Sequence, residues 1–507
     1  MLKTDNPNHY TFTTRHLEIG ILGGVKLNKL DSLRVTLSIN KPENTNKLRH
    51  NIDLYNDNQV EKLVRKVAER IEIGTSIVRR SLQELTNELE TYRISQLEKE
   101  EADQFTIVEL TKTELQAAEA YLKQDNLLQQ TNEDIGNTGV IGEGGNRLLM
   151  FLIFTSRKSN NPLHCISLGS SGTGKTHLQS KVAELIPEND IVDMTVLSEN
   201  AFYYFNRTEL QHKLILIEDM DGAENALYPL RELQSKRSIT KRVSHKDRNG
   251  TTKTIKLTVE GPVCVAGCTT QESIYEDNSN RSFLLYIDES PEQDQRIMEY
   301  QRLAAAGKIN VDTEAQIKRK LQHIQTLLKP IKVINPYAEY LKLPQSVFKP
   351  RRTNAHYLQF IEAITFYKQY QRERQFDTNT GEEYIETTIQ DIEEANELIK
   401  EVLLRKSDTL TGAARNYLER LKTYLKENNK DSFTNAEIRR NLRIKESTLR
   451  NYHNQLLVED YIKRNKDVKT KSYCFEITDV NEYKALKIHI DNCLRDCMAQ
   501  VNPQTRN

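Results

Sequence analysis

The chain has 507 residues, a mean hydropathy of −0.67, and 72 Lys plus Arg against 72 Asp plus Glu. This length accommodates roughly three or four domains, and without an apolar run near the roughly 20 residues that span a bilayer, or an apolar signal segment, we expect a cytoplasmic protein with no membrane partner. Because the formal net charge is zero, affinity for nucleic acid has to come from local basic patches.

The first hundred residues predict a small α+β domain. Residues 9–54 alternate apolar and polar side chains between glycine turns, which is typical of a small sheet, and residues 57–103 have helical periodicity. We expect an accessory domain over residues 1–105 that ends in a linker. Recruitment, oligomerisation and DNA contact all stay open as its role.

A phosphate loop follows, with the G-x-x-x-x-G-K-[ST] pattern and no mismatch. An apolar run at 164–168 predicts a buried strand before the loop, and residues 177–186 predict a helix after it. The glycines let backbone N–H groups point at phosphates, Lys175 reaches the β- and γ-phosphates, and Thr176 ligates Mg²⁺. We therefore expect ATP and Mg²⁺ to bind at Gly169, Ser170, Ser171, Gly172, Thr173, Gly174, Lys175 and Thr176.

An acidic pair ends the next apolar run. Residues 213–217 predict a buried strand, and Glu218 and Asp219 follow it, with Asp221 close behind. Acids at this place lie beside the phosphate loop, where one holds Mg²⁺ through water, together with Thr176, and another orients and deprotonates the attacking water. The usual order is Asp then Glu, so which acid is the base stays open.

A basic β-hairpin is predicted at 236–259. Two β-rich runs, 238–245 and 251–259, flank an Asn-Gly turn. The cations of this segment far outnumber its acids, which favours salt-dependent DNA binding; the alternative is a solvated edge that uses lysine against aggregation. The expected DNA contacts are Lys241, Arg242, Lys246, Arg248 and Lys253.

A further apolar run at 261–270 predicts a core strand that ends in two hydroxyls. Either Thr269 or Thr270 is expected to touch the γ-phosphate or the water. Arg281 precedes one more strand, at 284–288, where ring-forming ATPases place an arginine that reaches the nucleotide of a neighbouring subunit. The alternative for Arg281 is a solvated surface group.

The part after the sheet is predicted to be a helical lid or connector, 291–410. Arg351 and Arg352 open a helix that begins near Asn354, and an arginine there can sense the γ-phosphate of the bound nucleotide. The alternatives are contact with DNA phosphate and exposure to water.

Residues 411–480 predict a winged helix, with helices at 435–442 and 446–457 and two strands around a basic turn. In such a fold the second helix enters the major groove. Binding to protein is the alternative. The DNA-facing residues are expected to be Thr448, Arg450, Asn451 and Asn454.

The chain resembles AAA+ ATPases in the order of its motifs: the phosphate loop, the strand at 213–217 with its acids, the hairpin, the strand at 261–270 and Asn280-Arg281. A hairpin at this place is similar to that of superfamily 3 and MCM-type helicases. A closer resemblance, to the ATPase part of large bacterial mobile-element DNA primases, rests on Gly261-Pro262-Val263, Thr269-Thr270, Asn280-Arg281, Asp288-Glu289 and Arg351-Arg352. Some of those relatives carry a zinc finger and a Toprim domain. The six cysteines here form no C-x-x-C pair, so no zinc finger is indicated.

We therefore expect an α/β fold with an AAA+ P-loop core over 106–290, flanked by the accessory domain, the lid, the winged helix and a C-terminal helix with a polar tail, 481–507. The expected function is that of an ATP-hydrolysing, helicase-like DNA motor or replication initiator of a bacterial mobile element. Its partners are single-stranded or forked DNA, further copies in a ring of six, and a primase or another replication or transposition protein.

A second class of function stays open. The chain can be a DNA-bound AAA+ switch that recruits other factors, such as a transposition or defence regulator, without unwinding. A protein-only module with a vestigial site is disfavoured by the intact Lys175-Thr176 pair.

Overall fold

The computed structural model divides the chain into two compact units, residues 1–109 and 110–507, and each is described by itself. The structure describes residues 2–4, 6, 9–26, 32–42, 47–104, 110–195, 198, 200–222, 227–246, 252–270, 280–343, 350–466, 473–478 and 481–501. No helix within these ranges is long and apolar enough to cross a membrane.

The first unit is an antiparallel sheet with two helices. Its strands pair in chain order, and Val35, Leu37 and Ile39 alternate into the core. Both helices add buried apolar side chains to this core, among them Leu63 and Leu82. The elements are β1 (Leu2–Lys3), β2 (His9–Thr13), β3 (Glu18–Leu22), β4 (Arg34–Asn40), β5 (Leu48–Asp53), α1 (Asp57–Ile71) and α2 (Thr75–Gln104).

A five-stranded parallel sheet forms the centre of the second unit, in the order β12-β6-β11-β8-β7. Its inner strands are mostly apolar, and all their residues except the half-buried Lys213 are buried, because both faces of the sheet are covered, as parallel sheets require. One face packs on α5 and α6, and the other packs on α7. The elements are β6 (Cys165–Leu168), β7 (Ile191–Met194), β8 (Lys213–Ile217), β11 (Val263–Thr269), β12 (Phe283–Tyr286), α5 (Gly144–Thr155), α6 (Lys175–Ala183) and α7 (Leu227–Lys236).

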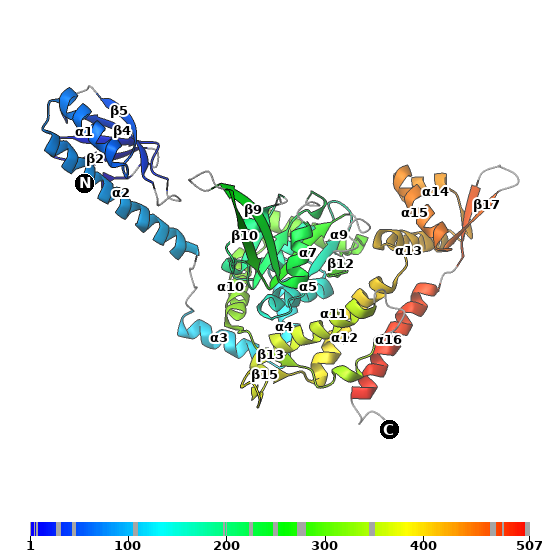
Figure 1. Ribbon diagram of the computed structural model, residues 1–507. Helices are drawn as coiled ribbons and strands as arrows, with labels where there is room; N and C mark the ends of the chain where they lie inside the picture. Colours follow the sequence, from blue (N-terminus) through cyan, green and yellow to red (C-terminus); the bar gives the residue numbers. More distant parts are fainter. Residues whose placement is uncertain are drawn as a thin grey trace. The chain divides into compact units, whose positions relative to one another are not determined.

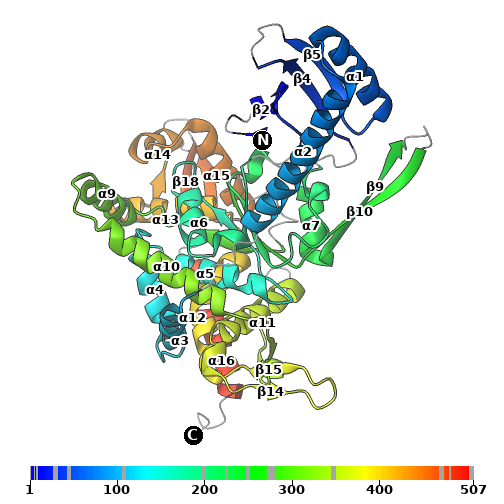
Figure 2. The same cartoon turned by 90° about the vertical axis from the view of Figure 1, so that its left-hand side faces the viewer.

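The predicted hairpin is present as β9 (Ser238–Lys246) and β10 (Thr252–Glu260). These strands form a separate two-stranded sheet, which extends from the core as an arm in both Figure 1 and Figure 2. Arg242 pairs with Lys256, and Lys241 pairs with Leu257 on the other face. The base of the arm is anchored by Ile239, which packs in the core under the sheet.

Helices precede and follow the sheet. They include α3 (Lys112–Leu122), α4 (Leu127–Gly136), α9 (Pro291–Ala305), α10 (Val311–Leu327), α11 (Pro350–Tyr367) and α12 (Ile389–Ser407). A small sheet of β13 (Lys332–Ile334), β14 (Gln375–Phe376) and β15 (Glu383–Glu386) stands among them. The sequence predicted helices alone here, because strands of two to four residues leave too few positions for an alternating pattern.

The C-terminal elements form their own apolar core. They are α13 (Gly412–Glu427), β16 (Ser432–Phe433), α14 (Asn435–Asn441), α15 (Glu446–Val458), β17 (Ile462–Lys466) and β18 (Tyr473–Ile477), with the strands antiparallel in the order β16-β18-β17. The last helix, α16 (Glu482–Val501), contacts α12 and lies beside it in Figure 1. Its Ile490 and Leu494 are buried in the same core as the parallel sheet.

Candidate nucleotide site and arginine pocket

The phosphate loop lies between the carboxyl end of β6 and the start of α6. Gly172 and Gly174 have φ angles of 83° and 91°, which glycine adopts without strain, and nothing lies within 4 Å of a Cβ built at either. Lys175 is 8% exposed, and its Nζ donates to the carbonyls of Gly169 at 2.8 Å and Ser170 at 2.6 Å. The loop is thus an open backbone cradle with its lysine folded against it.

The acidic pair lies beside this loop, as the order of the strands requires. Glu218 follows β8, and both Glu218 and Thr176 act on Cys268 of the neighbouring β11. Burial raises the pKa of the Cys268 thiol to about 11, against the hydrogen bond with Thr176 and the charge of Lys175. Cys268 therefore has both Thr176 of the loop and Glu218 of the acidic pair in its surroundings.

Asp221 is a functional candidate that the sequence analysis left without a role. Its carboxylate accepts hydrogen bonds from the hydroxyl of Thr269, and from Thr270 through the hydroxyl at 2.8 Å and the backbone N–H at 3.2 Å. Its own N–H donates to the Asp219 carboxylate at 2.9 Å. Burial favours a higher pKa for Asp221, but these hydrogen bonds and the charge of Lys175 outweigh it and lower the pKa.

Glu289, in the loop after β12, also reaches the phosphate loop. It accepts a hydrogen bond from the Ser170 N–H at 2.6 Å and one from the Ser170 hydroxyl at 3.2 Å. A carboxylate thus holds the first turn of the loop. The signal in the sequence was the Asp288-Glu289 pair, but its target is some 120 residues away in the chain and only the fold brings it close.

These groups fit a nucleotide with Mg²⁺. Backbone N–H groups at a helix N-terminus suit phosphate, and Mg²⁺ prefers oxygen ligands such as the Thr176 hydroxyl and the carboxylates of Glu218 and Asp219. Within the described ranges no three His, Cys, Asp or Glu side chains form a ready metal cluster. Mg²⁺ at such sites takes few protein ligands and completes its shell with phosphate oxygens and water.

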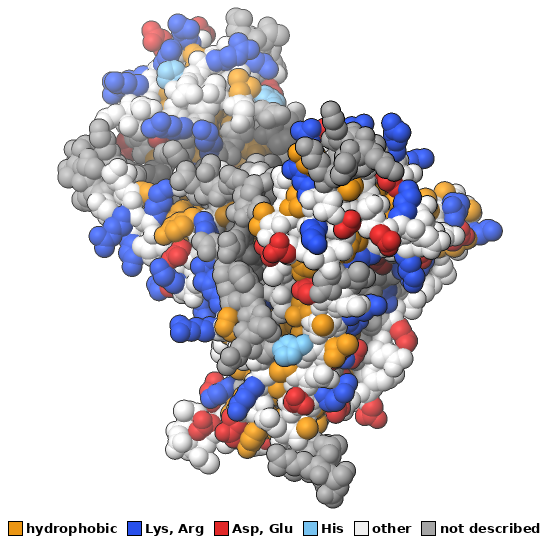
Figure 3. All heavy atoms as spheres, turned by 90° about the vertical axis from the view of Figure 1, so that its right-hand side faces the viewer, with side chains coloured by type: hydrophobic (Ala, Val, Ile, Leu, Met, Phe, Trp, Pro, Cys, Tyr) orange, Lys and Arg blue, Asp and Glu red, His pale blue; other side chains and the backbone are white. Residues whose placement is uncertain are grey.

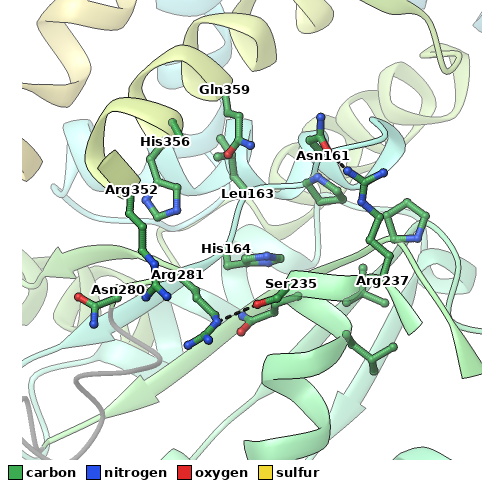
Figure 4. Close-up of a pocket in the computed structure, with 16 residues that line it drawn as sticks. Asn161, Leu163, His164, Ser235, Arg237, Asn280, Arg281, Arg352, His356 and Gln359 are labelled. Atoms are coloured by element: carbon green, nitrogen blue, oxygen red, sulfur yellow. Dashed lines mark hydrogen bonds between the residues drawn. The ribbon is translucent and has the colours of Figure 1, made fainter. Parts of the chain in front are cut away.

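A pocket of about 410 Å³ lies at the opposite, amino end of the sheet. His164 stands before β6, and Arg281 stands before β12, so the strand starts bring them together (Figure 4). Arg237 and Arg352 line the same pocket. The Arg281 Nε donates to the Ser235 hydroxyl at 2.9 Å, and Arg237 donates to the side chain of Asn161.

The charge of this pocket comes from its arginines. No Asp or Glu is among its lining residues within the described part of the chain. Burial and the charge of Arg281 lower the pKa of His164 to about 3. Burial, and then Lys406, His164 and Arg352, lower the pKa of His356. Both imidazoles are therefore neutral at pH 7, and the pocket suits an anion.

Arg352 lies in this pocket, at the opposite end of the sheet from the phosphate loop of its own chain. Its helix begins at Pro350, four residues before the predicted start, and Arg351 is exposed on it. The expectation that an arginine of this pair senses the γ-phosphate of a bound nucleotide stays a prediction; within its own chain, Arg352 lies away from the phosphate loop. Only the tertiary structure brings Arg352 to Arg281.

The predicted DNA contacts are divided by the structure. Arg242 is exposed on β9, but the Lys241 ammonium donates to Asn200 and lies 5.3 Å from the ring centroid of Tyr203, so it anchors the arm. Arg248 lies outside the described residues. Lys246 lies in β9 and Lys253 in β10, but the side chains of these two lysines are not described. On α15, three of the predicted contacts are exposed and Thr448 is half-buried; the exposed ones are Arg450, Asn451 and Asn454.

Charges of both signs are interspersed over the face in Figure 3, as the zero net charge leads one to expect. The Arg450 guanidinium, for example, bonds to Glu446 at 2.6 Å on the same helix. Exposed pairs of this kind stabilise little. A nucleic-acid surface on this chain is thus a local feature, and the arm and α15 are the candidates that the sequence named.

Comparison with known proteins identifies the nucleotide-binding part. The family described as "MTBMA_p00010 P-loop domain" matches residues 112–325, which is less than half of the chain. The chain contains a P-loop domain. No curated protein matches the chain.

Solved structures also match. One is the full-length MCM homologue from Methanopyrus kandleri, with 12% identity and a TM-score of 0.38. The match covers 59% of this chain and 63% of that protein. At this TM-score the likeness carries no argument for the fold or the activity.

Proposed function

We propose that the chain is an AAA+ ATPase that hydrolyses ATP as a ring and acts on DNA as a helicase-like motor or replication initiator. One observation carries this proposal: the arginine pocket and the phosphate loop lie at opposite ends of the same strands. Strand β6 has four residues, and at roughly 3.3 Å per residue it separates the two ends by about 13 Å. Arg281 therefore cannot complete the site of its own chain, and a second copy supplies it.

Within one site the roles follow from the contacts. The loop 169–176 and Lys175 hold the phosphates, while Thr176 with Glu218 or Asp219 holds Mg²⁺. Bound Mg²⁺ neutralises charge that develops on the phosphates. Asp221 keeps the hydroxyls of Thr269 and Thr270 in place at the end of β11. Arg281 of the next copy adds positive charge where the transition state is most negative.

The last turn of α7 links this chemistry to the hairpin. Ser235 on that turn accepts the hydrogen bond from Arg281. Two residues later, the Arg237 carbonyl accepts the Gly261 N–H at 2.7 Å and closes the base of the arm. A phosphate that draws Arg281 or Arg237 therefore pulls on the root of β9. This is the path by which hydrolysis moves the arm along DNA.

The proposal also includes the roles that the sequence predicts for the C-terminal domain and the helical connector. Elements α13 to β18 have the helices and antiparallel strands of a winged helix, with α15 as the DNA-reading helix. Helices α9 to α12 serve as the lid or connector. The proposed setting is a bacterial mobile element, with six copies in the ring and a primase or transposition protein as partner.

The test is ATP turnover with no DNA, single-stranded DNA, forked DNA or duplex, at two salt concentrations. We expect stimulation by DNA that falls as salt rises, since phosphate contacts release counterions, together with unwinding of the fork. Arg242→Ala with Lys256→Ala should remove the stimulation and leave basal turnover. Arg302→Ala is the matched control, because Arg302 is exposed on α9 and pairs with Glu299. Turnover that DNA does not change contradicts the motor.

A second candidate has an observation in its favour. Lys175 is bonded to its own loop, and Glu289 holds the Ser170 N–H. A loop whose lysine and first N–H already bond to groups of the same chain suits a slow, DNA-bound switch that recruits other factors. Slow turnover with tight ATP binding, DNA binding and no unwinding would support the switch over the motor.

A further inference from the structure

The peptide group between Gly169 and Ser170, at the start of the phosphate loop, is hydrogen-bonded on both sides to charged side chains. Its carbonyl, which belongs to Gly169, accepts a hydrogen bond from the Lys175 ammonium at 2.8 Å. Its N–H, which belongs to Ser170, donates to the Glu289 carboxylate at 2.6 Å. This single peptide group therefore links the carboxylate of Glu289 to the ammonium of Lys175.

The chain on either side of Glu289 is anchored independently of the loop. The Ile287 N–H donates to the Leu168 carbonyl at 3.0 Å, so the pairing of β12 with β6 continues past the end of the strand. Ser290 caps α9 and accepts the Gln293 N–H at 3.2 Å. Glu289 lies between these two anchors, so the sheet and α9 set the position from which its side chain reaches Ser170.

The contacts of Lys175 show what this peptide group controls. Its ammonium also donates to the Ser170 carbonyl at 2.6 Å, so two of its N–H donors go to the loop. An ammonium has three such donors, and the remaining one is available to a phosphate oxygen. Hydrogen bonds in a chain polarise one another, so the Glu289 carboxylate at the N–H makes the Gly169 carbonyl a stronger acceptor for Lys175.

We propose that Glu289 is a positioning residue, which holds the Gly169–Ser170 peptide and, through it, places the Lys175 ammonium where the phosphates of ATP bind. The inference rests on the proposed binding of ATP at this loop and adds a residue that acts on it from another segment. Simple repulsion predicts the opposite effect on affinity. A carboxylate near a phosphate site repels the ligand, so its removal should strengthen ATP binding, whereas loss of a positioning residue weakens it.

Three substitutions separate the hydrogen bond from the charge, with the equilibrium affinity for ATP and Mg²⁺ as the measurement. Glu289→Asp keeps the charge but is one methylene too short for Ser170, and Glu289→Ala removes both charge and bond. Each should weaken ATP binding by about 5- to 10-fold, the size of one hydrogen bond at an exposed site. Glu289→Gln keeps an oxygen for the Ser170 N–H and should bind ATP at least as tightly as the unaltered chain.

Glu292→Ala is the matched control. Glu292 is an exposed carboxylate in the first turn of α9, three residues after Glu289, so its removal changes the charge by the same amount and should not weaken ATP binding. Thermal unfolding without nucleotide checks that every variant is folded. If Glu289→Ala does not fold, Glu289→Asp and Glu289→Gln still give the comparison of bond with charge.

A double-mutant cycle tests whether Glu289 acts through Lys175. In the Lys175→Ala background, Glu289→Ala should cause no further loss of ATP affinity, because the group that it positions is gone. A loss of the same size in both backgrounds overturns the proposal. If Lys175→Ala binds no ATP at all, the comparison of Glu289→Asp with Glu289→Gln decides alone.

The remaining outcomes separate this inference from the proposed function. If ATP binding is unchanged in Glu289→Ala, or is weakened equally in Glu289→Gln, the positioning role is wrong and the ATPase stands. Tighter binding by Glu289→Ala also overturns the proposal and makes the contact with Ser170 a brake on the site, as the switch requires. If the unaltered chain binds no ATP, the proposed function and the inference are both wrong.

Discussion

The two ends of the parallel sheet differ in every property that matters for phosphate chemistry. At the carboxyl end lie the phosphate loop with Lys175, the hydroxyls of Thr269 and Thr270, and the acids that follow β8, of which Asp221 feels the charge of Lys175. At the amino end, Arg237, Arg281 and Arg352 line a pocket without a carboxylate among its described lining residues. Each end holds groups that the other lacks, and this difference is the basis of the proposal that a second copy brings the two together.

The largest expected effect is the loss of ATP turnover when either the phosphate loop or Arg281 is altered. Arg281→Ala should lower ATP turnover by about 10³-fold or more, as removal of an arginine finger does. Lys175→Ala should also abolish turnover. Mixing the two inactive variants should restore part of the activity, because the intact loop of one chain then meets the intact arginine of the other.

Turnover of the mixture against each variant alone is the measurement. Arg302→Ala, on the exposed face of α9, should leave turnover unchanged. If the mixture is as inactive as each variant alone, Arg281 does not complete the nucleotide site of a second copy and has another role.

A second experiment concerns the carboxyl end alone and decides between its acids. If Glu218 is the base, Glu218→Gln should lower kcat by about 10²- to 10⁴-fold while ATP still binds. Asp219→Asn should then act mainly on Mg²⁺ dependence. The measurement is kcat together with nucleotide affinity across a Mg²⁺ titration, and the opposite pattern would assign the base to Asp219.

A smaller effect is expected at Asp221. Asp221→Asn keeps the size of the side chain but removes the charge that accepts the hydrogen bonds of Thr269 and Thr270. A charged acceptor contributes about 1.5–3 kcal/mol, so we expect kcat to fall by about 10- to 100-fold with little change in KM. Thr270→Ala should give part of the same loss. A change in KM alone would mean that Asp221 serves binding rather than the positioning of the sensor hydroxyls.

The smallest expected effect is on the pH dependence of the free energy of unfolding, which differs between His164 at the amino end of the sheet and Asp221 at the carboxyl end. The pKa of His164 falls to about 3 on folding, from about 6.5 in an unfolded chain, so the unfolded state binds the proton first. The free energy of unfolding should therefore fall as pH drops from about 6.5 toward 3, by at most about 1.4 kcal/mol per pH unit for this group. The lowered pKa of Asp221 acts only below about pH 4, the unfolded value of an aspartate.

Chemical denaturation at pH 7 and pH 5 measures this difference. His164→Gln should reduce the loss of stability between these values, whereas Asp221→Asn should not alter it. An unchanged pH dependence in His164→Gln would show that folding does not lower the pKa of His164.

Local pattern predicted much of this molecule. The phosphate loop, the strand before the acids, the two strands of the hairpin and the helices 435–441 and 446–458 stand close to their predicted places, while the Asn-Gly turn lies outside the described residues. Each depends on residues near one another in sequence. The hydrogen bonds of Glu289 with Ser170 and of Asp221 with Thr269 and Thr270 were missed because they join segments far apart in the chain, and the small sheet β13–β15 was missed because its strands are too short to show a pattern.

What the sequence determined is the chemistry of the phosphate loop, since eight consecutive residues contain the turn, the lysine and the hydroxyl that phosphate and Mg²⁺ require. What only the tertiary structure decided is where the arginines lie. Arg237, Arg281 and Arg352 come from three distant segments, and the parallel direction of the strands puts their starts at the end away from the loop. No local pattern carries that information, because it follows from the order and direction of strands in the sheet.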